Sequence, residues 1–226
     1  MITSINQPHY IPYIGYFSMI YKVNNFIFHD DVDYIKGEWK NRNKIRQNKN
    51  SENFTYLTVP IKKQEEKKLN KLLISYDKDW VNDHQNKIKN SYYGEKYYKV
   101  VDNLFNSVVE NKPKYLSQLN INLILKILDY LEINTKIYYS SDFKSDLKKT
   151  DKIIYLCKEI GTSEYISNNK SSKYLEENKF FENFIKLNYQ NYKHPIYSQN
   201  KNNFLSNLSI IDLIVYYGKE SKSYLK

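Results

Sequence analysis

The chain has 226 residues, enough for one large domain, and its formal net charge of +10 suits partners that carry negative charge. Its single cysteine excludes a disulfide framework, and no apolar run approaches the ~20 residues that span a membrane. The lysines are scattered, and no zinc-finger, helix-turn-helix or RNA-binding aromatic pattern occurs. We therefore expect a cytoplasmic protein that binds an anionic small molecule and no nucleic acid.

The first third of the chain is predicted to alternate strands with a helix. Residues 2–6 form a short apolar run that ends at Gln-Pro, which is typical of a strand entering a turn. A helix is predicted over 15–23, further strands over 26–29, 54–60 and 72–76, and a polar loop over 42–52.

The middle of the chain is predicted to be helical, over 80–91, 95–110 and 115–131. Asp77 and Asp79 precede the first of these helices, as acidic residues often do at a helix N-terminus. This segment, about 79–132, is expected to be an insertion or small lobe within a single domain of residues 1–226.

The last third is predicted to alternate again. Strands are expected over 136–140, 164–167 and 184–189, and helices over 152–160, 171–178 and 209–217, with a polar loop over 190–207. Gly161 is expected to end one helix, while Ser209 and Asp212 are interpreted as a capping box at the start of another. The alternation predicts an α/β fold, Rossmann-like, with a mostly parallel central sheet and flanking helices.

The segment Gln7-Pro8-His9-Tyr10-Ile11-Pro12 follows the first predicted strand. Two prolines four residues apart stiffen this loop. Loops at the carboxyl ends of strands bind ligands in α/β sheets, so Gln7, His9 and Tyr10 are predicted to face a crevice. The alternative is a rigid turn that packs on the core.

Three carboxylates follow the second predicted strand, at Asp30, Asp31 and Asp33. Asp31 and Asp33 share one side of an extended chain and could hold Mg²⁺. They could equally pair with Arg42 or Arg46, the two arginines of the chain.

Trp80 and His84 are four residues apart on a predicted helix and so share one face. A histidine beside an aromatic ring could act as a general base, and a sugar could stack on Trp80; a half-buried helix face is the alternative. Ser140 and Ser141 follow a strand and could bind phosphate or cap a helix. Cys157 lies mid-helix among apolar residues and is expected to act as a small hydrophobic side chain.

Six patches of sequence, spread over nearly the whole chain, resemble the WbqC-like family. Tyr13 stands where that family usually has Trp. The resemblance implies a bacterial protein of surface-polysaccharide biosynthesis, in O-antigen or capsule clusters. The patches are residues 7–17, residues 30–34 with 39–43, residues 80–84 with 90–92, residues 140–141, residues 156–161 with 165–167 and 174–175, and residues 208–212.

A weaker resemblance links the opening segment to nucleotidyltransferases and class I synthetases. In that superfamily a strand also runs into a loop that contains proline and histidine, and a glycine then leads a helix. Residues 165–172 resemble its second phosphate-binding loop, but this chain has one histidine where that signature has a pair. The resemblance implies nucleotidyl transfer or adenylate formation with Mg-ATP or CTP, with Mg²⁺ on Asp31 and Asp33.

We expect an enzyme, and the favoured reaction is acyl or aminoacyl transfer to an amino sugar or sugar nucleotide. Coenzyme A or an acyl or peptidyl carrier protein would supply the group. Alternatives are the nucleotidyl chemistry and a non-catalytic binding or scaffold subunit. His84 is expected to deprotonate the amine, with His9 and Asp31 as further catalytic residues and Arg42 holding phosphate or carboxylate. The other predicted substrate-binding residues are Gln7, Tyr10, Trp39, Asn41, Trp80, Ser140, Ser141, Tyr165 and Ser167.

Overall fold

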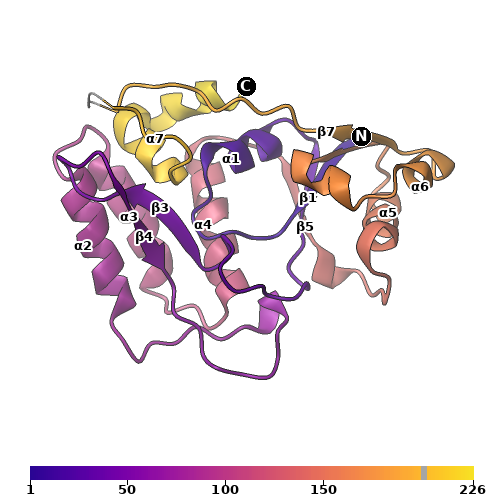
Figure 1. The fold of residues 1–226 in the computed structure, drawn as a ribbon, viewed down its shortest axis with the longest axis horizontal. Coiled ribbons are helices and arrows are strands. Elements are labelled where there is room, and N and C mark those ends of the chain that lie inside the picture. The colour runs from indigo at the N-terminus through magenta and orange to yellow at the C-terminus, as the bar shows by residue number, and fades with distance from the viewer. Residues whose placement is uncertain (200–202) are drawn as a thin grey trace.

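A five-stranded parallel sheet forms the centre of the computed structural model, which describes residues 1–199 and 203–226 (Figure 1). The strands lie in the order β5–β2–β1–β6–β7. The chain order therefore reverses between β1 and β6, which makes this pair the topological switch point of the sheet. The strands are β1 (Ile2–Asn6), β2 (Asn25–Phe28), β5 (Lys136–Tyr139), β6 (Glu164–Ser167) and β7 (Lys186–Tyr189).

Each face of the sheet carries its own apolar cluster, as expected of a doubly wound fold. Phe26 and Phe28 belong to a cluster that includes residues of α1 (Ile14–Tyr21) and α4 (Leu116–Tyr130). Ile27, between the two phenylalanines, belongs with Ile5 to the other cluster, which includes residues of α5 (Lys149–Glu159) and α6 (Glu177–Glu182). Adjacent strand residues point to opposite faces, so β2 is buried on both sides. The predicted Rossmann-like α/β fold is confirmed.

The long connection from β2 to β5 builds a lobe beside the sheet (Figure 1). It contains an antiparallel hairpin of β3 (Arg42–Arg46) and β4 (Phe54–Thr58) and three helices. These are α2 (Trp80–Tyr92), α3 (Tyr98–Val109) and α4, close to the predicted helices. The last α-helix, α7 (Ile210–Tyr217), contacts α3 and β3 and so joins the C-terminal part of the chain to this lobe. No helix among residues 1–199 and 203–226 is long and apolar enough to cross a membrane.

Several local predictions were wrong. The polar stretch predicted as a loop over 42–52 begins with β3, because Asn43 and Ile45 are buried while Arg42 and Lys44 are partly exposed, which gives a strand period. The strand predicted over 72–76 has only isolated bridges. The helix predicted over 171–178 is a 3-10 helix, Asn169–Lys173, followed by α6. Of the loop predicted over 190–207, residues 200–202 lie outside the described residues.

The predicted capping box at α7 was also wrong. The Ser209 hydroxyl donates to the carbonyl of Ile11 at 2.7 Å and makes no capping bond. Asp212 is buried instead, and accepts hydrogen bonds from Tyr92 Oη (2.9 Å), Tyr197 Oη (2.7 Å) and Gln199 Nε2 (2.8 Å). The carboxylate therefore connects α7 to α2 and to the segment before α7. The glycine cap at Gly161, with φ of +68°, is confirmed.

Candidate functional site

The loop after β1 is held in place by the lobe. Asn120 of α4 donates its amide hydrogens to the carbonyls of Pro8 (2.9 Å) and Lys40 (2.7 Å). The backbone N–H of Tyr10 donates to the carbonyl of Trp39 at 3.0 Å. The loop after β1 and the segment before β3 therefore lie against each other.

The second half of this loop is fixed from two further elements. Asn43 of β3 donates to the carbonyls of Tyr10 (3.0 Å) and Ile11 (2.6 Å), and Ser209 also donates to Ile11. Ile11 has φ of +38°, a strained conformation for a β-branched residue. Such strain persists only where the surroundings over-determine the backbone, so this loop is pre-organised.

The loop presents Gln7 and His9 as partly exposed side chains. The imidazole of His9 packs on the ring of Tyr16, with ring centroids 5.4 Å apart. Burial lowers the pKa of His9 to about 3, and the charge of Lys40 acts in the same direction. His9 is therefore a neutral imidazole at pH 7, able to accept or donate a hydrogen bond.

Tyr10 and His84 lie inside the lobe. The Tyr10 hydroxyl is 2.8 Å from His84 Nδ1, and His84 is 0% exposed, with ring contacts to Trp80 and Phe105. Burial lowers the pKa of His84 to about 4. The expectation that His84 takes a proton from substrate does not fit this placement, because no substrate reaches the ring. Trp80, 4% exposed, likewise has no free face for a sugar.

The carboxylates after β2 bind the serines after β5. Asp30 is buried and accepts hydrogen bonds from Ser140 Oγ (3.1 Å), Ser141 N (3.1 Å) and Ser141 Oγ (2.8 Å). Ser140 Oγ also bonds to Asp31. The two serines thus join the carboxyl ends of the adjacent strands β2 and β5. The sequence had suggested phosphate binding or helix capping for them, and not this role.

Asp31 forms an ion pair with Lys152 of α5, and the two side chains are 23% and 10% exposed. Partial burial acts to raise the pKa of Asp31, but hydrogen bonds from Lys152 and Ser140 lower it overall. Asp33 pairs with Lys68 at 3.0 Å. The alternative that Arg42 or Arg46 pairs with these carboxylates was wrong.

Because Asp31 and Asp33 are neutralised by different lysines, they do not fit a shared Mg²⁺ site. In the part of the chain that the structure describes, no three His, Cys, Asp or Glu side chains group to hold a metal ion.

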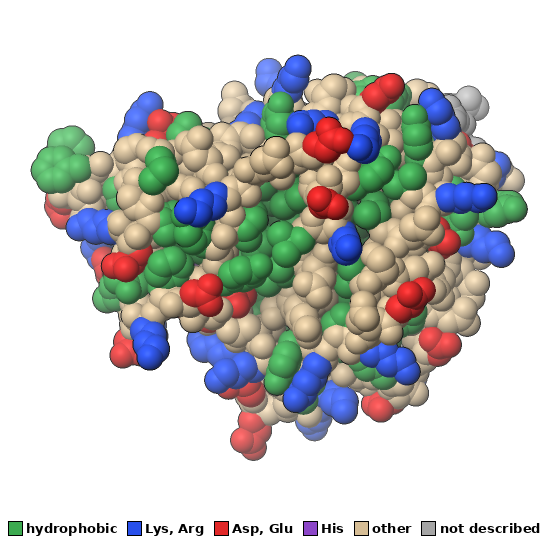
Figure 2. Space-filling model, turned by 180° about the vertical axis from the view of Figure 1, so that it is seen from behind, with side chains coloured by type: hydrophobic (Ala, Val, Ile, Leu, Met, Phe, Trp, Pro, Cys, Tyr) green, Lys and Arg blue, Asp and Glu red, His purple; other side chains and the backbone are tan. Residues whose placement is uncertain are grey.

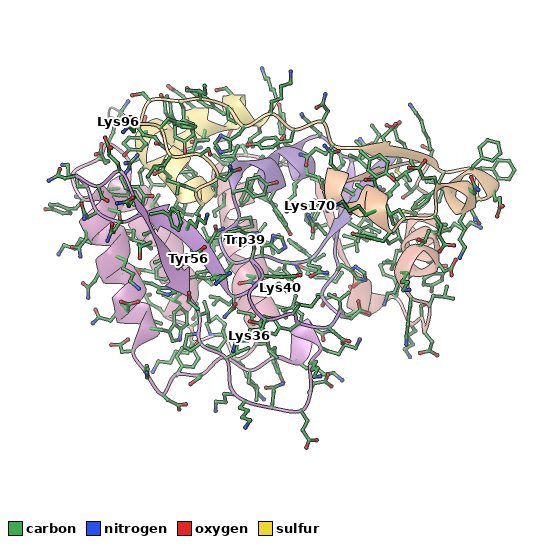
Figure 3. All side chains as sticks on the ribbon, in the orientation of Figure 1. Lys36, Trp39, Lys40, Tyr56, Lys96 and Lys170 are labelled. Carbon is green, nitrogen blue, oxygen red and sulfur yellow. The ribbon has the colours of Figure 1, made fainter. Side chains whose placement is uncertain are left out.

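The carboxyl end of β6 forms the other side of the switch point. Asn168 accepts hydrogen bonds from Ser171 N (3.2 Å) and Ser171 Oγ (3.1 Å), which fixes the turn into the 3-10 helix and leaves Lys170 exposed. Figure 3 places Lys170 on this side and Lys40 on the lobe side. Tyr165 is buried and stacks on Phe180, so it packs in the core and does not face a substrate.

The structure places the predicted residues in different surroundings. Gln7 and His9 follow β1, Asp31 follows β2, and Ser140 and Ser141 follow β5, so all five lie at the carboxyl edge of the sheet. Ser167 ends β6 there but is buried, and Asn41 is buried and bonds to Tyr34 and Val59. Trp39 and Arg42 lie on or beside the hairpin.

Sequence reasoning missed two lysines, Lys40 and Lys152. Lys40 is fully buried, pairs with Glu38, and is close enough to His9 to lower its pKa. Lys152 holds Asp31. Lysines are so frequent in this chain that neither had a distinguishing signal in the sequence.

One surface hollow, of about 500 Å³, lies elsewhere. It is bounded by the end of α4 and the amino end of β5, and its charged lining residues are Asp129 and Glu132.

Figure 2 shows the molecule from behind. Apolar side chains lie across the middle of this rear face, and no histidine is visible on it. The histidine-bearing edge is therefore not on the surface drawn there.

Fold and site together define a doubly wound α/β protein with a histidine-bearing loop and a lysine-bearing loop on either side of its switch point. The chain belongs to the WbqC-like protein family, whose model matches residues 7–224. It is similar to the uncharacterized protein Rv1507c of Mycobacterium tuberculosis. The two sequences are 32% identical over an alignment of 227 residues, which covers 99% of this chain and 96% of that protein. No solved structure matches the chain.

Proposed function

We propose that the chain is an enzyme of surface-polysaccharide biosynthesis that binds a sugar nucleotide at the switch point and transfers an acyl or aminoacyl group to its amino sugar. One observation carries the proposal: β1 and β6 pair in parallel, with Ile2 opposite Glu164 and Thr3 opposite Tyr165. The loops of His9 and Lys170 therefore leave adjacent strand ends, where doubly wound proteins bind nucleotides.

The charges at this edge suit a pyrophosphate. Lys170 is exposed, and Lys40 lies close enough to His9 to lower the pKa of that imidazole. A phosphate bound at Lys170 beside His9 would favour the protonated form of His9 and so raise the pKa of that imidazole from about 3 toward the range of a general base.

In the proposed reaction the amine nitrogen of the sugar attacks the carbonyl carbon of an acyl thioester. The N–C bond forms as the C–S bond breaks, and the proton passes from the ammonium to His9 and then to the departing thiolate. Coenzyme A or a carrier protein is the proposed thioester. The proposal places this chemistry in the cytoplasm.

Calorimetry with UDP-N-acetylglucosamine tests the binding step. His9→Gln and Lys170→Ala are each expected to weaken binding about tenfold, because each removes a phosphate partner. Lys62→Ala removes one exposed lysine elsewhere and is expected to leave binding unchanged. Equal binding by all four proteins would refute the site.

A second candidate, nucleotidyl transfer or adenylate formation, is favoured by the positions of the two loops. The histidine loop follows β1, and the lysine–serine loop follows β6, as the weaker superfamily resemblance implies. Incubation with Mg-ATP or CTP and an amino sugar separates the candidates: pyrophosphate release indicates nucleotidyl chemistry, and release of free thiol from acyl-coenzyme A indicates acyl transfer. Binding without either product indicates a non-catalytic subunit and contradicts both.

A further inference from the structure

The outer face of the β3–β4 hairpin combines aromatic rings with cations. Asn43 and Leu57 are buried, whereas Arg42, Lys44 and Tyr56, which alternate with them, are partly exposed. We use the name aromatic–basic face for Trp39, Arg42, Lys44, Phe54 and Tyr56. Trp39 is 39% exposed and Phe54 is 44% exposed.

The rings surround the cations closely. Lys44 Nζ lies 4.1 Å from the ring centroid of Phe54, 5.6 Å from that of Trp39 and 6.0 Å from that of Tyr56. Arg42 Cζ lies 4.9 Å from the Tyr56 centroid. These contacts hold the cations in place without neutralising them.

Within the described part of the chain, the two cations have no carboxylate partner. Among residues 1–199 and 203–226, neither Arg42 nor Lys44 forms an ion pair, while the nearby Glu38 binds Lys40. Arg42 Nη2 donates to the carbonyl of Gly37 at 2.6 Å, but its Nε is buried and has no hydrogen-bond partner among the described residues. A buried N–H without a partner is costly.

The face adjoins the proposed site. Trp39 accepts a hydrogen bond from the backbone of Tyr10, in the loop that carries His9, and Lys40 follows directly. Figure 3 shows Trp39 and Lys40 between the hairpin and the sheet, with Tyr56 on the hairpin. A ligand that extends along the face would therefore reach the edge of the sheet where His9 lies.

We propose that the aromatic–basic face binds an acidic oligosaccharide, one whose sugar rings carry carboxylates. The apolar faces of pyranose rings stack on exposed aromatic rings, and the carboxylates would pair with Arg42 and Lys44. That this saccharide is part of a surface polysaccharide rests on the proposed function. The binding itself does not.

Titration with a tetramer of galacturonic acid, followed by the indole resonance of Trp39 and by saturation transfer to the sugar protons, tests the face. The neutral comparison is maltotetraose, which is expected to bind at least about tenfold more weakly. The double variant R42A/K44A is expected to weaken galacturonate binding about tenfold or more. The control K62A/K63A removes the same charge from exposed positions and is expected to change binding less than about threefold.

Three results would overturn the proposal: no saturable binding to the natural chain, equal losses in R42A/K44A and K62A/K63A, or tighter binding of octauridylate than of the galacturonate. Phe54→Ala, at an exposed ring, gives a second variant should R42A/K44A unfold. Its thermal midpoint shows whether a loss of binding reflects a loss of folding.

Binding measurements on the same variants distinguish a failure of this inference from a failure of the proposed function. R42A/K44A is expected to bind UDP-N-acetylglucosamine as the natural chain does, and His9→Gln is expected to retain galacturonate binding. If galacturonate binds at the face but no sugar nucleotide binds at the switch point, the proposed function fails and the aromatic–basic face stands as a glycan-binding surface.

Discussion

Asn120 is the residue through which the lobe fixes the first loop, and its replacement tests the account of the site. Its amide group donates to the carbonyls of Pro8 and Lys40, and the side chain is fully buried. Asn120→Leu keeps a branched side chain of similar size but removes both donors. Each buried carbonyl that loses its donor costs about 1–3 kcal/mol, so we expect a loss of about 2–6 kcal/mol.

The measurement is thermal unfolding by calorimetry, with Asn122→Leu as control. Asn122 lies on the same helix but is exposed, so the control makes the same change in helix propensity without losing a buried bond. A chain of this size loses about 2–4 °C of midpoint per kcal/mol, so Asn120→Leu should unfold at least about 4 °C lower. Equal midpoints for the two variants would refute the reasoning.

Three further predictions follow from buried charges and rings. Burial lowers the pKa of His84 from 6.5 to about 4, so its neutral form stabilises the fold fully above about pH 6.5, and this contribution is lost as the pH falls through 4. His84→Gln should therefore flatten the fall of the urea midpoint between these pH values. Asp31→Asn and Lys152→Met should each cost about 1.5–3 kcal/mol in urea unfolding, and additive costs in the double variant would contradict their coupling. Asp212→Leu should cost about 3 kcal/mol or more, because three donors lose their acceptor; a midpoint within 2 °C of the natural chain would show otherwise.

The parallel sheet could be predicted because strand-like runs such as Ile2–Asn6 and Asn25–Phe28 alternate with helices and are followed by polar residues. Strand β3 could not, since Arg42, Asn43 and Lys44 have the composition of a loop. Its period of two depends on the burial of Asn43, which the lobe makes possible by placing the carbonyls of Tyr10 and Ile11 against that amide. Tertiary contacts therefore decided the strand.

The positions of the candidate site residues could likewise be predicted only in part. The spacing of Trp80 and His84 correctly placed both on one helix face, but spacing does not show whether a face meets solvent or the core. The loop of Gln7 and His9 was placed correctly at a strand end. Lys152 could not be distinguished from many surface lysines, because its partner Asp31 is 121 residues away in the sequence.

The bond between Ser209 and Ile11 joins residues 198 positions apart. All five strands of the sheet precede α7 in the chain, so a ribosome can have made the whole sheet before the residue that holds Ile11 has emerged. At about 5–20 residues per second, a nascent chain spends seconds with the strained loop unsupported on that side. The carbonyl of Ile11, in the loop that carries His9, therefore gains its hydrogen bond from Ser209 only after all five strands have been made.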